Sequence, residues 1–444
     1  MVLGSSLASL GDGTLPASFE GLKSQVDLKW VEEALAQTGV ATVRRRKLPA
    51  EQVVWLVIGM ALYRDRPIPE VVQRLNLVMP GKSGKRQGVA KGALPRARSR
   101  VGPEPLRVLF EKTARRWALE SADRHRWRGL RVFGADGTMM RVPDSAKNRK
   151  EFELPPSSRG SAGYPQIRAV GLMVLRSHLL LDFAFGGCRT GEMSLAREML
   201  LRVPASSLTI LDRYYIDYVL WHDLRTGAED RHWLVRAKKR TKKWKTVERY
   251  GRGDELVEIP FSPTARRENP ELPETFLARA IRYHRKGFRP RVLLTSLLDP
   301  KVFPACEIAE LYHERWELEV GYDEIKTHAL ERLESLRSES PDRIRQEVWG
   351  LVVAYNLVRR EMELAALEWG LPPRRISFRT ALVLIRDLFV WAATASPGSL
   401  PKMVKGMRLD MEQLVLPERR PERQCPRHVK IKMSNYARNH GHPC

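Results

Sequence analysis

The apolar positions of the first 120 residues follow a helical spacing. Val31 and Leu35 stand four residues apart, and prolines stand just before two longer apolar segments, residues 50–63 and 70–77. Proline is tolerated in the first turn of a helix, so each of these prolines marks a helix start. We therefore predict a helical N-terminal domain over residues 1–120.

From residue 130 the pattern changes to that of β-strands. The apolar runs become short and rich in β-branched and aromatic residues, at 130–135, 167–175, 178–185, 208–211 and 233–235. A more polar stretch over residues 238–290 interrupts this series before a further apolar run at 292–297. We predict an α/β fold with a mixed sheet, in which residues 238–290 form an insertion.

Helical spacing returns after the last apolar run. It extends over residues 305–336, 345–369 and 379–393, and the chain ends in a basic segment. These changes of pattern divide the rest of the chain into an α/β domain over residues 125–345, a helical region over 346–410 and a basic tail over 411–444.

The chain is strongly basic, with 77 Lys and Arg against 52 Asp and Glu and a formal net charge of +25. Such an excess favours a polyanionic partner, most often nucleic acid, although an anionic membrane surface also attracts basic proteins. The longest apolar stretch, residues 53–63, is too short to span a membrane, and the N-terminal residues have no basic region ahead of an apolar segment, so we expect no export signal. We expect a cytoplasmic protein without a membrane segment.

The four cysteines are widely spaced and form no Cys-x-x-Cys pair, which indicates a reducing compartment and neither a disulfide framework nor a zinc ribbon. Cysteine and histidine gather in the tail, at Cys425, His428, His440, His442 and Cys444. Their spacing matches no usual zinc pattern. A zinc site in the tail is therefore the less favoured interpretation.

A basic segment precedes the predicted strands. Residues 81–100 contain seven lysines and arginines, several glycines and no acid, which is typical of a flexible loop that leads into a short basic helix. Arg96, Arg98 and Arg100 at its end are the predicted contacts to DNA phosphates outside the active site. The alternative is an ordinary solvated run of charge.

Two aspartates stand where apolar runs end. Asp136 follows the run 130–135, and Asp212 follows the run 208–211 in the same way. Each carboxylate would lie beside the core yet open to a substrate, and two neighbouring strands would bring them together. The alternative for either residue alone is a turn or a helix cap, which is the commoner role of an Asp after a strand.

A third acid lies in the predicted helix 305–336. Tyr312, Arg315, Glu319 and Lys326 fall within about 60° of one another around a 3.6-residue turn. The neighbouring stripe is apolar and would pack against the sheet: Leu311, Leu318, Tyr322, Ile325 and Ala329. The polar stripe would then face the two aspartates, although Arg315 and Glu319 also have the spacing of an ordinary i, i+4 ion pair.

Three carboxylates in one site repel one another unless a cation lies among them. Hard oxygen ligands select Mg²⁺ or Mn²⁺, and two such ions can cut and join a phosphodiester at a single site. We therefore predict that Asp136, Asp212 and Glu319 bind two Mg²⁺ ions, and that Arg315 and Lys326 hold phosphates nearby.

The spacing of Tyr312, Arg315, Glu319 and Lys326 is the Y-x2-R-x3-E-x6-K signature, so the chain resembles the DDE transposases of bacterial insertion sequences of the insertion-element-four type. Further motifs agree, and the resemblance covers roughly residues 30–440: Asp136-Gly-Thr, Pro143-Asp144, Asn148, Tyr164-Pro-Gln, Asp212-Arg, Trp349-Gly and Tyr355-Asn-Leu. The chain departs from many relatives at Tyr214-Tyr215, where they have a small residue after Asp-Arg.

The resemblance implies a ribonuclease H-like catalytic domain with a mainly β insertion, and a helical N-terminal domain that helps to bind transposon ends. It implies that Asp136, Asp212 and Glu319 are the metal-binding catalytic triad. Relatives nick the transposon end, form a hairpin, reopen it and join the end to target DNA, usually as a homodimer.

The resemblance also implies contacts to double-stranded DNA at terminal inverted repeats and at the target. Tyr312, Arg315 and Lys326 would position the DNA ends. In relatives an aromatic residue of the insertion holds a flipped base, and Trp244, within a lysine-rich stretch, is the candidate here. The protein would then act at the bacterial nucleoid.

Two other functions are compatible with part of the sequence. Asp136-Gly-Thr also occurs in phosphatases that form an aspartyl phosphate, but the position of their nucleophile is Gly134 here, so no phosphoaspartate can form. The second alternative is a DNA-binding descendant of a transposase that no longer cuts DNA. The presence of all three acids argues against it.

Overall fold

The computed structural model describes residues 28–40, 48–75, 77, 89–90, 92–156, 163–237, 244–284, 290–331, 335–392 and 395–417. The cysteines and histidines of the tail, the basic residues at 81–88 and the lysines at 238–243 lie outside these residues, so what was predicted for them stays a prediction. No helix in the described ranges is long and apolar enough to cross a membrane.

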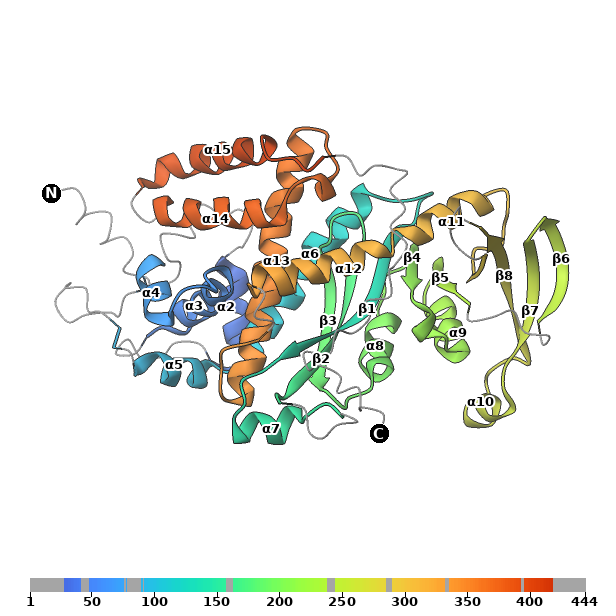
Figure 1. The fold of residues 1–444 in the computed structure, drawn as a ribbon, viewed down its shortest axis with the longest axis horizontal. Coiled ribbons are helices and arrows are strands. Elements are labelled where there is room, and N and C mark those ends of the chain that lie inside the picture. The colour runs from blue at the N-terminus through green and yellow to red at the C-terminus, as the bar shows by residue number, and fades with distance from the viewer. Residues whose placement is uncertain are drawn as a thin grey trace, which may run out of the picture.

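In the described residues one nine-stranded sheet has the order β3-β2-β1-β4-β5-β9-β8-β7-β6 (Figure 1). Its first part comprises β1 (Arg131–Arg141), β2 (Gln166–Val174), β3 (Leu180–Gly187), β4 (Ser207–Leu211) and β5 (Arg231–Arg236). β1, β4 and β5 run parallel, whereas β2 and β3 continue the sheet antiparallel. All residues of β4 are buried, as expected for a central strand covered on both faces.

The insertion is mainly β and continues the same sheet. It comprises β6 (Lys245–Gly251), β7 (Asp254–Pro260), the short helix α10 (Pro263–Glu268) and β8 (Thr275–Tyr283), and β9 (Arg291–Thr295) follows it. β9 pairs antiparallel with β5, and β8, β7 and β6 follow outward in turn. Backbone hydrogen bonds therefore join the insertion to the strand beside β4.

Helices cover the sheet. The structure places there α7 (Ala146–Phe152), α8 (Glu192–Leu201), α9 (Tyr218–Thr226), α11 (Ala305–His313), α12 (Trp316–Asp323) and the π-helical segment η5 (Glu324–Ala329). α8 packs on β2 and β3, α9 packs on β5, and α12 packs on β1. Figure 1 shows α11 and α12 crossing the strands one after the other.

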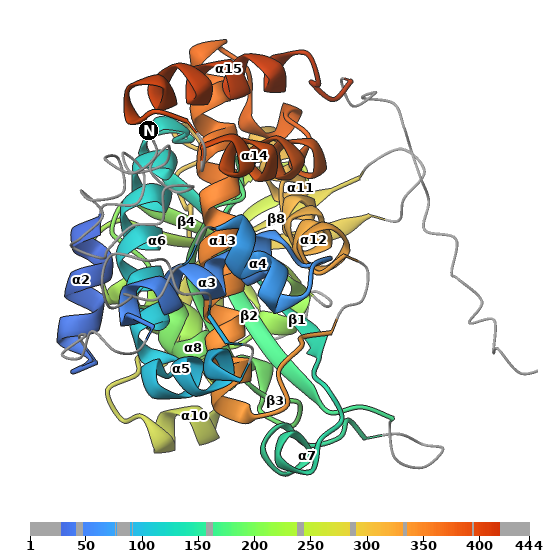
Figure 2. The same cartoon turned by 90° about the vertical axis from the view of Figure 1, so that its left-hand side faces the viewer.

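The remaining helices form a layer at one end of the sheet. They are α2 (Leu28–Gln37), α3 (Ala50–Leu62), α4 (Ile68–Arg74), α5 (Ala93–Val101), α6 (Glu104–Arg124), α13 (Pro341–Glu368), α14 (Phe378–Ala392) and α15 (Leu400–Glu412), with 3₁₀ turns η6 (Pro373–Arg375) and η7 (Pro397–Ser399). α13 packs along α3 and α6, and α6 in turn packs on β3 (Figure 2). At Gly350 a Cβ atom would stand 2.6 Å from Val57 Cγ1, so only glycine lets α13 approach α3 this closely.

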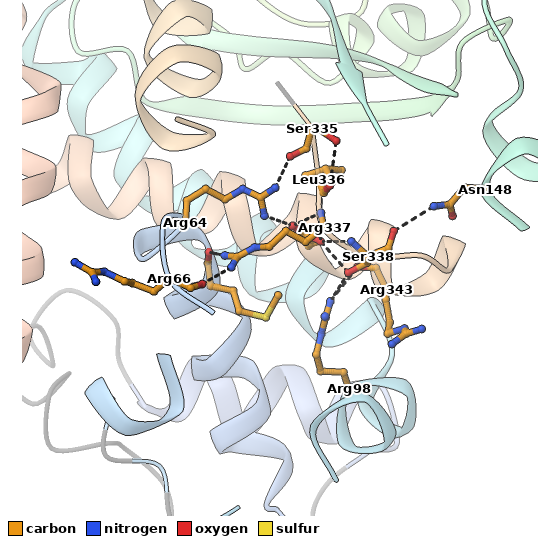
Figure 3. Close-up of polar contacts among 11 residues, drawn as sticks. Arg64, Arg66, Arg98, Asn148, Ser335, Leu336, Arg337, Ser338 and Arg343 are labelled. Atoms are coloured by element: carbon orange, nitrogen blue, oxygen red, sulfur yellow. Dashed lines mark hydrogen bonds and ion pairs between the residues drawn. The ribbon is translucent and has the colours of Figure 1, made fainter. Parts of the chain in front are cut away.

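A buried polar cluster joins the helical layer to the α/β domain just before α13 (Figure 3). The carboxylate of Glu347 accepts hydrogen bonds from Arg64 Nη1 at 2.8 Å, from Ser338 N at 3.1 Å and from Ser338 Oγ at 2.8 Å. Arg98 Nη2 donates to Ser338 Oγ at 3.1 Å, and Asn148 Nδ2 donates to the Ser338 carbonyl at 3.1 Å. The cluster thus ties segments that are far apart in the sequence to one short stretch of chain.

The predicted α/β fold with a mixed sheet is confirmed, and each predicted strand has a counterpart. Two local predictions were wrong. β1 does not end at Asp136 but continues to Arg141, because β2 pairs with it throughout. The helix predicted over residues 305–336 is interrupted, since α11 ends at His313, α12 begins at Trp316 and a π-helical segment follows.

Candidate active site

Asp136 lies where β1 and β4 cease to pair. Their last paired residues are Ala135 and Leu211, so the edge of β1 that faces β4 is open beyond Ala135. Asp212 is the residue after Leu211, and the two parallel strands therefore bring both aspartates to the same end of the ladder. The Asp136 Oδ1 atom accepts a hydrogen bond from Gly137 N at 2.8 Å.

Asp212 begins the 3₁₀ turn η4 (Arg213–Tyr215). Its Oδ1 atom accepts a hydrogen bond from Tyr214 N at 3.3 Å, and its carbonyl accepts one from Tyr215 N at 3.0 Å. Asp212 thus caps a turn, as the alternative held, and stands beside Asp136 as well. Of the two tyrosines that depart from relatives, Tyr214 is exposed and Tyr215 is fully buried.

The guanidinium of Arg315 joins α12 to the first aspartate. Its Nη2 atom donates to Glu319 Oε1 at 3.1 Å, and its Nη1 atom lies 3.8 Å from Asp136 Oδ2. Burial opposes the charge on Arg315, but Tyr312 and the surrounding acids outweigh burial and raise the pKa of Arg315. The i, i+4 ion pair between Arg315 and Glu319 is therefore formed, and Arg315 also lies near Asp136 of β1.

The surroundings of Asp136 show the crowding of acids in the site. Burial raises the pKa of Asp136 to about 6, and the carboxylates of Glu192 and Asp212 add to the rise. Arg315 and the Gly137 N–H act in the opposite direction without cancelling it. More positive charge at this position would stabilise the ionised carboxylate.

Carboxylate oxygens are the donor set that Mg²⁺ and Mn²⁺ prefer, so the chemistry of the site fits a hard divalent cation. Among the residues that the structure describes, no three His, Cys, Asp or Glu side chains are close enough together to hold one ion. The guanidinium of Arg315 stands between Asp136 and Glu319. Closing these acids around a metal ion therefore requires Arg315 to turn away from Asp136.

The four signature residues lie on successive helical segments, because the helix is interrupted between α11 and α12 and becomes π-helical after Asp323. Tyr312 is buried, and burial raises its pKa to about 12. Lys326 is half-buried in η5. All the residues of the predicted apolar stripe are buried: Leu311, Leu318, Tyr322, Ile325 and Ala329.

A buried network supports α12 and η5, and it was not predicted. His178 Nε2 lies 2.9 Å from Glu317 Oε2, and Arg359 Nε donates to Glu324 Oε2 at 2.9 Å. The Tyr322 hydroxyl accepts from Gly171 N at 2.9 Å and donates to the Asp136 carbonyl. These contacts fix the helix that carries Glu319 against the strand that carries Asp136.

The contact between Glu192 and Tyr215 in the site was also not predicted. Glu192 begins α8, and its Oε1 atom accepts a hydrogen bond from the Tyr215 hydroxyl at 2.8 Å. Its carboxylate lies against Gly137, where a Cβ atom would stand 2.5 Å from Oε2. The glycine after Asp136 was the sequence feature that pointed to this close approach.

Two of the predicted DNA contacts are corrected. Arg98 is 3% exposed and donates to Gln346 Oε1 at 2.8 Å, so its guanidinium is committed to the interior. Trp244 is 4% exposed and packs in the core, so neither face of its ring is open to a base. Arg96 and Arg100 are exposed on α5 and remain candidates for contact with phosphates.

Two known families match parts of this sequence. Residues 16–111 match the family described as insertion element 4 transposase N-terminal, and residues 127–357 match the transposase DDE domain. The second match covers more than half of the chain and contains Asp136, Asp212 and Glu319. The chain is a DDE transposase of the insertion element 4 family.

This transposase is 36% identical to the transposase InsG for insertion sequence element IS4 of Escherichia coli (strain K12), over 94% of its own length and 92% of that protein. It is 33% identical to the putative transposase InsZ of the same strain, over 55% of its own length and 76% of that protein. The piggyBac transposase synaptic complex with hairpin DNA aligns with 91% of this chain and 86% of that chain, at a TM-score of 0.41 and 10% identity. A similarity at this TM-score supports no inference about function.

The transposase is therefore an enzyme with a ribonuclease H-like DDE domain, as the resemblance implied, and domains of this kind use divalent metal ions. The phosphatase alternative also fails on steric grounds. A Cβ atom at Gly134 would stand 2.7 Å from Leu175 Cδ2 and 2.9 Å from Leu318 Cδ1, so no aspartate side chain fits where a phosphatase nucleophile would stand.

Proposed function

We propose that this transposase cuts double-stranded DNA at the terminal inverted repeats of its element and joins the freed ends to target DNA. Asp136, Asp212 and Glu319 hold two Mg²⁺ ions in this proposal, and Mn²⁺ can replace them. Such ions activate a water or a 3′-hydroxyl and stabilise the leaving oxygen of a phosphodiester. The observation that supports the proposal most is the convergence of Asp136 and Glu319 on Arg315, beside Asp212.

The basic residues of the site position DNA in this proposal. The guanidinium of Arg315 turns from Asp136 to a phosphate, which it can bind through two parallel N–H donors. Lys326 binds a second phosphate as a point charge from η5. Tyr312 helps to position the DNA end, since phosphoryl transfer depends mainly on positioning and electrostatic stabilisation.

We further propose that excision proceeds through a hairpin and in a homodimer. The 3′-hydroxyl freed by the first nick attacks the opposite strand, and the resulting hairpin is then reopened before strand transfer. Arg96 and Arg100 on α5 contact phosphates of the bound end. Because its substrate is bacterial DNA, the transposase acts in the cytoplasm, at the nucleoid.

The test is excision from a plasmid that carries the native flanking DNA of the gene, with Mg²⁺ present. Wild type is compared with Asp136→Asn, Asp212→Asn and Glu319→Gln, and Glu198→Gln, at an acid that is 87% exposed, is the matched control. We expect excision by wild type and the control only, with a hairpin visible on a denaturing gel. No excision by any protein, with end binding intact, would favour the DNA-binding descendant.

A further inference from the structure

The catalytic centre contains a fourth acid that lies outside the Y-x2-R-x3-E-x6-K signature. Glu192 stands in the first turn of α8 and is half-buried. Its Oε1 atom accepts a hydrogen bond from the Tyr215 hydroxyl at 2.8 Å. Because the Tyr215 ring is fully buried, this hydrogen bond holds the Glu192 carboxylate in one orientation.

The Glu192 carboxylate fills the space beside Gly137. A Cβ atom on that glycine would stand 2.5 Å from Oε2 and 2.7 Å from Oε1, closer than such atoms can approach. Asp136 is the preceding residue on β1, so the two carboxylates flank a single peptide unit. The absence of a side chain at position 137 is what admits Glu192 to the site.

Glu192 and Glu319 reach the site from opposite faces of the sheet. Successive side chains on a strand point to opposite faces, so Gly134 and Gly137 face opposite ways. A Cβ atom at Gly134 would meet Leu318 of α12 at 2.9 Å, whereas one at Gly137 would meet Glu192 of α8. The open end of the ladder between β1 and β4 is therefore flanked by an acid on each side.

Tyr215 connects Glu192 to the second aspartate. Tyr215 N donates to the Asp212 carbonyl at 3.0 Å, so the hydroxyl that holds Glu192 belongs to the same tight turn as Asp212. Trp221 Nε1 donates to the Tyr215 carbonyl at 2.9 Å and fixes that turn from behind. The position of Glu192 is therefore coupled to that of Asp212.

One oxygen of Glu192 is left for a ligand. Within the described part of the chain Oε1 accepts the hydrogen bond from Tyr215, and Oε2 accepts none. A carboxylate that is anchored through one oxygen and open at the other has the geometry of a metal ligand oriented by an outer partner. Four carboxylates would also balance the charge of two divalent ions, which three do not.

We propose that Glu192 is a fourth carboxylate ligand of the divalent-cation site, oriented by the Tyr215 hydroxyl and contributing Oε2 to an ion at the open end of the ladder between β1 and β4. The inference rests on the proposed function, because it needs metal-dependent chemistry. It assigns α8, as well as the two strands and α12, to the catalytic centre.

The test is the affinity of the full chain for Mn²⁺ alone, measured by the electron paramagnetic resonance signal of the free ion. Glu192→Gln keeps an oxygen that can accept from Tyr215 but removes the charge. We expect it to weaken Mn²⁺ binding on the order of tenfold or more, and we expect the same of Asp136→Asn. Glu198→Gln, on the same helix but 87% exposed, should bind as wild type does.

The outcomes separate the two proposals. Wild-type affinity in Glu192→Gln, with weaker binding in Asp136→Asn, would overturn the role of Glu192 and leave the proposed function standing. No Mn²⁺ binding by wild type, or equal affinity in all variants, would overturn both. If Glu192→Gln does not fold, Gly137→Ala displaces the carboxylate without removing an acid, and unchanged Mn²⁺ affinity in that folded variant would contradict the proposal.

Discussion

Two carboxylates of this transposase, Glu347 and Asp136, have opposite surroundings. Glu347 accepts hydrogen bonds from Arg64 and from the backbone and hydroxyl of Ser338, all of them held in place where the helical layer meets the α/β domain. The Asp136 carboxylate accepts a hydrogen bond from the Gly137 N–H and faces Arg315 at 3.8 Å across the site.

The surroundings of Glu347 suit a carboxylate that stabilises the fold, whereas those of Asp136 suit a carboxylate that takes part in catalysis. A buried carboxylate whose lone pairs are satisfied by fixed donors stabilises one conformation and has no oxygen left for a ligand. A carboxylate crowded by other acids destabilises the empty site, yet it is ready to bind a cation. A carboxylate therefore stabilises the fold where the helical layer meets the α/β domain, and it serves the chemistry at the open end of the ladder between β1 and β4.

The largest effect is expected at the catalytic acids. Glu319→Gln should lower single-turnover cleavage roughly a thousandfold or more, because several kcal/mol of transition-state stabilisation depend on the metal ligand, at 1.36 kcal/mol for each factor of ten. The melting temperature should stay close to that of wild type, as the side chain keeps its shape. Cleavage within tenfold of wild type would contradict the assignment of Glu319.

At Glu347, where the helical layer meets the α/β domain, we expect the opposite result: a large loss of stability and little change in cleavage. Glu347→Ala should lower the free energy of unfolding by about 3–5 kcal/mol, since it leaves the buried Arg64 guanidinium without its counter-ion. Denaturant unfolding measures this loss, and Glu339→Ala, at an exposed acid nearby, is the control. The cleavage rate per folded molecule should change little. A loss of stability no larger than that of the control would show that the junction does not stabilise the fold.

The pH dependence of stability should also distinguish the two regions. The pKa of Asp136 is about 6 in the folded protein against an ordinary 3.8, so the folded state binds the proton more tightly. The stability from this group is fully present below about pH 4 and lost as the pH rises through 6. Without metal, Asp136→Asn should therefore gain stability over wild type on the order of 2 kcal/mol between pH 4 and pH 7.

Thermal melts at the two pH values measure this difference, and added Mg²⁺ should reduce it by binding the ionised carboxylate. A difference between wild type and Asp136→Asn that is the same at pH 4 and pH 7 would mean that Asp136 is not crowded by other acids.

The smallest effect is expected on α5, where two nearby arginines differ in exposure. Arg96→Ala should weaken DNA binding modestly and lower the slope of log affinity against log salt by about 1, without a change in melting temperature. Arg98→Ala should lower the melting temperature and leave the slope as it is, because Arg98 is buried against Gln346. Filter binding at several salt concentrations measures the slope for each variant, and thermal melts measure the two melting temperatures. An unchanged slope in Arg96→Ala would place the DNA elsewhere.

The parts of the fold that could be predicted were those encoded locally. Short apolar runs identified the strands, and an acid directly after a run identified Asp136 and Asp212 as neighbours once the strands proved parallel. The ion pair of Arg315 and Glu319, which their spacing offered as the alternative interpretation, is also present.

The parts that could not be predicted depend on contacts between distant segments. The burial of Arg98 is set by Gln346, which is 248 residues away, and no local pattern encodes that contact. Glu192 enters the site because Tyr215 and Gly137 receive it from two other elements. No proline or glycine marks the interruption between α11 and α12, since Glu314 and Arg315 occupy it.

The continuity of the sheet gives the insertion a mechanical connection to the catalytic centre. β9 joins the insertion to β5, and β5 pairs with β4 up to Leu211, the residue before Asp212. Backbone hydrogen bonds between neighbouring strands resist sliding, so we expect β6, β7 and β8 to move together with the central strands as one rigid sheet. A force that DNA applied at the outer edge of the sheet would be transmitted across the sheet to β4. The tilt of the whole sheet would then determine how an incoming DNA strand meets Asp136 and Asp212.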